Sequence, residues 1–285
     1  MKVTVLGSSG QVGAYLAEYL INQGHSVTGL DIVNGAEQDL TIIPNLVLET
    51  AIVESDYVFF LAFDVGGSRY LKKYQHTYQF INNNTRIMAN VFGLLEKYKK
   101  PFVFASSQMS NMSYSPYGVL KNVGEMYSKA LGGLIVKFWN VYGIEHDMDK
   151  AHVITDFIRK GMETGTISMM TDGQEQREFL YAEDCCRALA TIMNNHTDFT
   201  SNDNLHITSF HAMRIIDVAE IIMNCFHNAG RTDVRVYIGP DKDTVQQDRK
   251  NPADTYILNW WKPEVSIHDG IAKVFEEMYS EQDQI

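Results

Sequence analysis

A doubly wound α/β fold around a parallel sheet is the fold class that this sequence of 285 residues predicts. Short apolar runs rich in Val, Ile, Leu and Phe alternate with segments of helical periodicity, which is the pattern of βαβ units whose strands are buried on both faces. A glycine-rich turn follows the first apolar run and opens a helical pattern. A hydrophobic content of 45% is enough for a substantial core in a chain of this length.

Alternating strands and helices are expected in the first half of the chain. The strands fall at about residues 2–6, 26–31, 57–62, 102–106 and 134–139, and the helices at about 11–23, 79–98 and 115–131. Parallel strands need right-handed crossovers, so this order places the ligand crevice beyond the carboxyl ends of the strands. The residues expected at these ends are Gly7, Asp31, Ala62 and Ser107.

A smaller C-terminal lobe is expected after about residue 144, where polar turns become more frequent. Strand-like segments at 167–170 and 234–238 are separated by helical patterns such as 153–161 and 215–228. The predicted division is a Rossmann-type domain over 1–143 with a return at about 178–212, and a substrate-binding lobe over 144–177 and 213–285.

Charge and cysteine content exclude several classes of protein. The net charge of −11 disfavours binding to a nucleic-acid backbone, which needs clustered Lys and Arg. The three cysteines, at positions 185, 186 and 225, provide neither a disulfide framework nor the CxxC spacing of a metal site, so no metal is expected. Without a signal region or a membrane-length apolar run, the protein is expected to be soluble, unprocessed and cytoplasmic.

The glycine-rich turn predicts a dinucleotide site. Its glycines follow a strand and open a helix, where they permit a tight turn and a close approach of the backbone to a pyrophosphate at the helix N-terminus. The residues expected to bind the cofactor here are Gly7, Gly10, Gln11, Val12 and Gly13.

Asp31 predicts which dinucleotide is bound. It ends the second predicted strand, where a carboxylate can accept hydrogen bonds from both ribose hydroxyls and repel a 2′-phosphate, so NAD is favoured over NADP. The alternative is that Asp31 caps a helix or a turn.

A serine, a tyrosine and a lysine predict proton transfer. Ser107 closes an apolar strand, and Tyr117 and Lys121 share a helix face because side chains at i and i+4 are neighbours. The ammonium of Lys121 would favour the ionised Tyr117 phenol and so lower its pKa. Together with the nucleotide turn, this pair indicates a redox enzyme.

These three features resemble the extended short-chain dehydrogenase/reductase family, particularly its nucleotide-sugar epimerases and dehydratases. Further similar stretches extend the resemblance over nearly the whole chain. They are Asp39-Leu40 at the adenine position, Leu61-Ala62 beside the adenosine ribose, the segment 137–143 with Asn140, the phosphate-binding segment 173–184 with Arg177, and Trp260 to Pro263 with Gly270 and its helix.

The resemblance implies a role for each site residue. Tyr117 would accept a proton from a sugar hydroxyl while the nicotinamide takes a hydride from the same carbon. Lys121 would hold the nicotinamide ribose, and Ser107 would polarise the developing carbonyl. Asn140 would contact the substrate, and Arg177 would clamp its diphosphate. The alternative for Arg177 is a surface salt bridge with an adjacent glutamate at position 175 or 178.

Departures from the family pattern limit the reaction. The connection from Ser107 to Tyr117 is shorter than is usual, so a loop that helps to enclose the sugar is missing. Gln108 and Met109 stand where 4,6-dehydratases carry an Asp-Glu pair, which disfavours simple 4,6-dehydration. His152 resembles the catalytic histidine of the GDP-fucose synthase type, although a capping or packing role is the alternative.

The methionines near the tyrosine helix are interpreted as core residues, since Met adapts to irregular gaps. They are Met88, Met109, Met112 and Met126. The family pairs two such helices from each subunit, so the resemblance implies a homodimer.

The function favoured by the sequence is an NAD-dependent nucleotide-sugar epimerase or dehydrogenase, acting by tyrosine-assisted hydride transfer at the sugar C4. One alternative is an NAD(P)-dependent reductase of a keto sugar or small carbonyl compound. Another is a nucleotide-binding protein without turnover, against which the intact Ser107, Tyr117 and Lys121 count.

Overall fold

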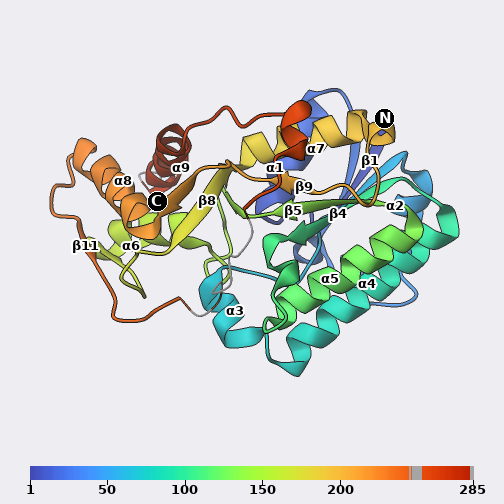
Figure 1. Cartoon of the computed structure of the whole chain (residues 1–285), viewed down its shortest axis with the longest axis horizontal. Helices are drawn as coiled ribbons and strands as arrows, with labels where there is room; N and C mark the ends of the chain where they lie inside the picture. Colours follow the sequence, from blue (N-terminus) through green and yellow to red (C-terminus); the bar gives the residue numbers. More distant parts are fainter. Residues whose placement is uncertain (244, 246–251, 283–285) are drawn as a thin grey trace.

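Six parallel strands form the central sheet, in the order β2-β1-β3-β4-β5-β9 (Figure 1). The structure is a computed structural model that describes residues 1–243, 245 and 252–282. The strands are β1 (Lys2–Leu6), β2 (Ser26–Leu30), β3 (Tyr57–Phe60), β4 (Phe102–Ser107), β5 (Leu134–Phe138) and β9 (Leu205–Ile207). The first five confirm the predicted strands. The order reverses between β1 and β3, which places a ligand crevice beyond the carboxyl ends of these strands.

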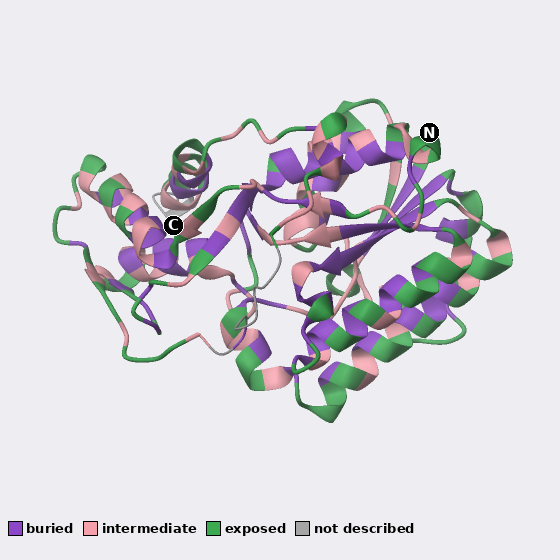
Figure 2. Cartoon of the chain, in the orientation of Figure 1, coloured by how far each residue is buried: buried purple, intermediate pink, exposed green. Residues whose placement is uncertain are grey.

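Helices cover both faces of this sheet (Figure 1). On one face, α1 (Gln11–Asn22) packs against α7 (Ala182–Asn194). On the other lie α2 (Leu46–Glu54), α4 (Tyr78–Tyr98) and α5 (Pro116–Leu131). The central strands are therefore buried almost throughout, as Figure 2 shows. This is the doubly wound arrangement that the apolar runs predicted.

Among the described residues, the C-terminal lobe contains two small sheets and three helices. The sheets are β6 (Asn140–Tyr142) with β8 (Gln176–Tyr181) and β10 (Ala212–Arg214), and β7 (Thr166–Ser168) with β11 (Arg235–Tyr237). The helices are α6 (Val153–Thr164), α8 (Ile215–Asn228) and α9 (Ile267–Gln282). They enclose a separate core that includes Phe157, Ile222 and Phe275. Within the expected return to the first domain, α7 packs against α1 and β9 forms the sixth strand of the central sheet. The division into domains stays a prediction.

Short elements complete the chain. They are α3 (Ser68–Tyr74) and the 3₁₀ turns η1 (Ile32–Asn34), η2 (Ala36–Gln38), η3 (Gln108–Asn111), η4 (His196–Asp198) and η5 (Tyr256–Asn259). The sequence analysis did not identify α2 or α3. Each spans few turns, so its apolar spacing is too brief to separate a helix from a loop.

The prediction that four methionines fill the core is correct for three of them. Met88, Met109 and Met112 are buried against the α4 and α5 side of the sheet. Met126 is 61% exposed, so its assignment to the core was wrong. It lies on the outer face of α5, because the inner face of that helix is already filled by residues such as Leu120 and Gly124.

Candidate active site

The glycine-rich turn joins β1 to α1 and packs closely against the end of β3. Gly7 has a φ of +87°, and a Cβ at this position would lie 2.8 Å from the backbone nitrogen of Ala62. Gly10 is the N-cap of α1, and Gly13 is buried in its first turn. The side-chain nitrogen of Gln11 is buried and has no hydrogen-bond partner among the described residues. A tight cradle with an unpaired donor at a helix N-terminus fits a dinucleotide pyrophosphate.

Asp31 follows β2 directly and binds the turn. Its Oδ2 accepts a hydrogen bond from the backbone N–H of Ser9 at 3.0 Å, and its Oδ1 accepts one from Val33 at 3.3 Å. Asp31 is therefore the N-cap of η1, which confirms the capping role weighed from the sequence. These bonds hold the carboxylate beside the glycine turn, where the predicted ribose contact remains a prediction.

The remaining cofactor residues lie at the same edge of the sheet. Leu61 continues β3 and donates its backbone N–H to the carbonyl of Leu6 at 3.0 Å, which fixes Ala62 beside Gly7. The Asp39 carboxylate accepts a hydrogen bond from the backbone N–H of Thr41 at 2.8 Å, and Leu40 is buried in the core beneath it. The structure thus places Ala62 beside the glycine turn, and Asp39 follows Gln38, whose Oε1 accepts a hydrogen bond from the backbone N–H of Asp31 at 2.9 Å.

The proposed catalytic residues meet where β4 ends and α5 begins. Ser115 caps α5 by accepting a hydrogen bond from the backbone N–H of Gly118 at 3.2 Å, and Pro116 occupies the first turn. A Cβ at Gly118 would lie 2.2 Å from the carbonyl oxygen of Met109, so this glycine lets α5 approach the short connection closely. Tyr117 and Ser107 then line the same cavity, and the Ser107 side chain acts on the phenol to lower its pKa.

Lys121 points into the protein between aromatic rings. Its Nζ donates a hydrogen bond to the carbonyl of Ala105 at 2.6 Å and lies 3.8 Å from the centroid of the Phe63 ring. The distance from Nζ to the centroid of the Tyr117 ring is 5.8 Å. Lysine and tyrosine therefore share one helix face, as the spacing predicted.

Burial controls the proton affinities of this pair. Loss of solvent raises the pKa of Tyr117 to about 12, and the hydrogen bond from Ser107 opposes that rise. Burial also lowers the pKa of Lys121 to about 7, which the charge of Glu125 opposes. The expected lowering of the Tyr117 pKa by Lys121 is thus not what the structure shows. Both groups are desolvated, and burial is the largest influence on the pKa of each.

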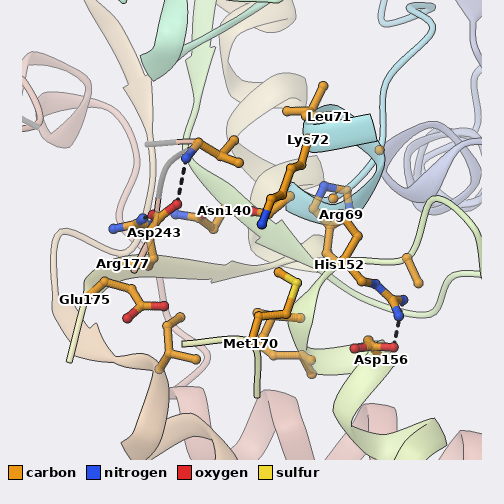
Figure 3. A pocket seen from close by; sticks show the side chains of 18 of the residues that line it. Arg69, Leu71, Lys72, Asn140, His152, Asp156, Met170, Glu175, Arg177 and Asp243 are labelled. Atoms are coloured by element: carbon orange, nitrogen blue, oxygen red, sulfur yellow. Dashed lines mark hydrogen bonds and ion pairs between the residues drawn. The ribbon is translucent and has the colours of Figure 1, made fainter. Parts of the chain in front are cut away.

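An open cleft beside these residues is lined by both lobes (Figure 3). The predicted site residues that line it are Ser107, Tyr117, Asn140, His152 and Arg177. Asn140 begins β6 and donates a hydrogen bond to the carbonyl of Glu178 at 3.2 Å. Across the cleft, Arg69 of α3 forms an ion pair with Asp156 of α6 at 2.8 Å. The five predicted residues come from separate segments and converge on one cavity.

Arg177 lies at one end of the cleft, in an ion pair with Asp243 (Figure 3). Its Nη1 also donates a hydrogen bond to the carbonyl of Gln176 at 2.7 Å. The alternative weighed from the sequence was a surface salt bridge to an adjacent glutamate. It did not include Asp243. Asp243 is distant in sequence and no local pattern indicated it. The guanidinium is largely buried in the cleft wall, where it is paired with Asp243.

His152 is held by a carboxylate that the sequence analysis missed. Its Nδ1 lies 2.7 Å from Oε1 of Glu145, and its backbone N–H donates to Oε2 of the same residue at 2.7 Å. Burial lowers the pKa of His152, but the charge and hydrogen bond of Glu145 raise it more, so the net shift is upward. His152 occupies the N-cap position of α6, yet its side chain is directed to Glu145.

Comparisons with known proteins identify one family model and several similar proteins. The model of the "NAD dependent epimerase/dehydratase family" matches residues 3–207. UDP-glucuronic acid decarboxylase 1 of Danio rerio is 22% identical over 310 residues, covering 96% of this chain and 72% of its own. UDP-N-acetyl-alpha-D-glucosaminuronate decarboxylase of Bacillus cytotoxicus is 26% identical over 265 residues, covering 80% of this chain and 81% of its own.

Solved structures share the whole fold. UDP-glucose 4-epimerase of Thermotoga maritima, solved with UDP-glucose, has a TM-score of 0.81 at 20% identity, covering 99% of this chain and 100% of its own. UDP-N-acetylglucosamine 4-epimerase of Methanobrevibacter ruminantium, in complex with UDP-N-acetylmuramic acid, has a TM-score of 0.80 at 21% identity, covering 98% of both chains.

No helix in the described part of the chain has the length and apolar character needed to span a membrane.

The glycine cradle against Ala62 and the unpaired donor of Gln11 fit NAD at the edge of a doubly wound sheet. The family model covers most of the chain, including the cradle, the Ser107–Tyr117–Lys121 group and Arg177. The chain therefore belongs to the NAD-dependent epimerase/dehydratase family, whose cofactor is NAD.

Proposed function

We propose that this protein oxidises the C4 hydroxyl of a nucleotide-diphosphate sugar with NAD, as an epimerase or a dehydrogenase. The observation that carries the proposal is that Ser107, Tyr117 and Arg177 line one cleft. A base, an oxygen-polarising hydroxyl and an anion-binding guanidinium are the groups that this reaction needs.

Tyr117 is the proton acceptor in this proposal. Its pKa of about 12 in the free protein means that the phenolate needs electrostatic support. The ammonium of Lys121 near the Tyr117 ring and the hydroxyl of Ser107 provide that support. Tyr117 takes the proton of the C4 hydroxyl, and Ser107 donates a hydrogen bond to the oxygen as it becomes a carbonyl. NAD, when bound, supplies the acceptor for the hydride from C4 and can later return it.

Epimerisation requires that the keto sugar rotate in the site before C4 is reduced again. The hydride then returns to the opposite face of C4. Tyr117 then returns its proton to the oxygen, so the protein ends in its starting protonation state. Dehydrogenation would release the keto sugar. The relatives named above include both epimerases and decarboxylases, and all of these names refer to UDP sugars. We propose a UDP sugar as the first substrate to test.

Product analysis tests the proposal. The protein would be incubated with NAD and, separately, UDP-glucose, UDP-N-acetylglucosamine, UDP-glucuronic acid, GDP-mannose and dTDP-glucose, and the products followed by NMR. A C4 epimer supports the epimerase, and a keto sugar with stoichiometric NADH supports the dehydrogenase. Release of carbon dioxide from UDP-glucuronic acid would assign the decarboxylase reaction instead. Turnover of none of them, with reduction of a simple ketone when NADH or NADPH is supplied, would contradict the proposal and favour the reductase.

Asp31 should set the cofactor preference. Asp31→Asn keeps the acceptor for Ser9 and removes the negative charge. The ratio of NAD to NADP affinity is expected to fall about tenfold, equivalent to about 1.4 kcal/mol, because the 2′-phosphate is no longer repelled. Calorimetric titration of both cofactors measures the ratio, with Glu37→Gln as a control for an exposed nearby carboxylate. Equal affinities in the unaltered protein would refute the role of Asp31.

A homodimer through α4 and α5 is proposed from the resemblance and from their exposed apolar side chains. These are Tyr78, Ile81, Val119, Met126 and Tyr127. Met126→Glu should shift the dimer to monomer, because a charge would be desolvated in the interface. Sedimentation velocity measures the change, and Ile238→Glu alters a similarly exposed side chain on another face. A monomeric unaltered protein would exclude this interface.

A further inference from the structure

A buried carboxylate lies one helical turn beyond Lys121 and takes no part in the mechanism above. Glu125 of α5 is only 7% exposed. Its Oε1 accepts a hydrogen bond from the hydroxyl of Ser106 at 2.5 Å and lies 3.3 Å from Nζ of Lys137. A buried charge of this kind is costly unless it is paired and hydrogen-bonded, and here it is both.

Lys137 links this carboxylate to the other side of the active-site serine. It stands opposite Ser106 in the register of β4 and β5. Its Nζ also donates a hydrogen bond to the hydroxyl of Ser110 at 3.1 Å. The Glu125–Lys137 pair thus holds Ser106, immediately before Ser107, and Ser110 of η3, which follows it. The chain is therefore held on both sides of Ser107.

The same carboxylate acts on Lys121 through its charge. The two residues are at i and i+4 of one helix, and the charge of Glu125 opposes the effect of burial on the Lys121 pKa. Other groups around the pair are Tyr117 on α5, Lys137 on β5 and His206 on β9. Burial and Lys137 lower the pKa of His206 to about 4, so this ring is neutral at pH 7. The buried residues of α4, which packs against α5, are all uncharged.

We propose that Glu125, paired with Lys137, is a positioning residue of this active site: it braces Ser107 through Ser106 and Ser110 and places a negative charge one turn from Lys121. The inference rests on the proposed function, since it assigns a role relative to Tyr117 chemistry. Lys121 stabilises the Tyr117 phenolate only while the Lys121 side chain is protonated. Without the charge of Glu125, less opposes the lowering of the Lys121 pKa by burial. Lys121 therefore loses its proton at a lower pH.

The pH profile of Glu125→Gln tests this role. Glutamine keeps an acceptor for Ser106 and removes the charge. The alkaline limb of the kcat–pH profile is expected to move to lower pH by about one unit. At pH values above this limb, kcat should then be about tenfold lower, while KM changes little. Lys137→Arg keeps the pair and should leave the limb in place. Glu49→Gln, which removes a carboxylate paired with Lys97 elsewhere, is the matched control. A Glu125→Gln profile that overlays that of the unaltered protein would overturn the proposal.

A measurement without substrate separates this inference from the proposed function. Titration of the Lys121 side-chain nitrogen by NMR in lysine-labelled protein, assigned with Lys121→Met, should show a lower pKa in Glu125→Gln. If no nucleotide sugar is turned over but this shift occurs, the proposed function fails and the electrostatic role of Glu125 stands. If turnover is found and neither the NMR titration nor the limb moves, the role of Glu125 fails alone.

A second variant covers the case in which Glu125→Gln does not fold. Ser106→Ala keeps both charges and removes one brace of Ser107. We expect kcat to fall about fivefold with the limb unmoved, since a misplaced polarising hydroxyl weakens stabilisation of the carbonyl oxygen. An unchanged kcat would contradict the bracing role.

Discussion

Tyr117→Phe should abolish turnover while NAD binding persists. The substitution removes the phenolic oxygen and keeps the ring, which packs edge-on against Phe63 with 5.8 Å between centroids. A general base contributes about 10²- to 10⁴-fold to the rate, so kcat should fall by that factor. The measurement is kcat on the substrate identified by product analysis, together with NADH fluorescence for cofactor binding.

Tyr127→Phe is the matched control for this prediction. Tyr127 lies on the same helix, is 45% exposed and stacks on Phe92, so loss of its hydroxyl should leave kcat unchanged. Activity of Tyr117→Phe within a few-fold of the unaltered protein would show that another group is the base. Loss of NADH binding would show instead that the ring, and not the proton, had been disturbed.

Removal of the Arg177 guanidinium should weaken nucleotide-sugar binding. Charge-assisted hydrogen bonds contribute roughly 1.5 to 3 kcal/mol, so the Kd for UDP sugars should rise about 10- to 100-fold. NAD affinity should not change, because Arg177 lines the cleft and none of the glycine-turn residues does. Calorimetric titration of UDP and UDP-glucose measures the effect.

The design of this variant must take Asp243 into account. Arg177→Met alone leaves the Asp243 carboxylate partly buried without its cation, and breaking a buried pair costs about 3 to 5 kcal/mol of stability. The double variant Arg177→Met with Asp243→Asn avoids that charge, and Asp243→Asn alone is its control. Unchanged UDP-sugar affinity in the double variant would rule out diphosphate binding by Arg177 and strengthen the small-carbonyl alternative.

Much of the fold could be predicted from short-range patterns. Apolar runs bounded by turns located five of the six strands of the central sheet, and the glycine turn located the first crossover. The small lobe was harder, because β6 and β10 have three residues each and such runs resemble loops. Met126 was misassigned for a related reason: helix periodicity shows that a face is apolar, but not whether this chain covers it.

The sequence by itself determined which reactive residues could meet. A serine at a strand end and a tyrosine and lysine at i and i+4 are local relations, and a parallel sheet collects strand ends at one edge. The tertiary structure alone decided their partners and proton affinities. Asp243 reaches Arg177, and Glu125 reaches Ser106 and Lys137, across long stretches of chain. Burial raised the pKa of Tyr117 where the Tyr-Lys spacing had suggested a lower one, because desolvation depends on everything packed around a group and not on its neighbours in sequence.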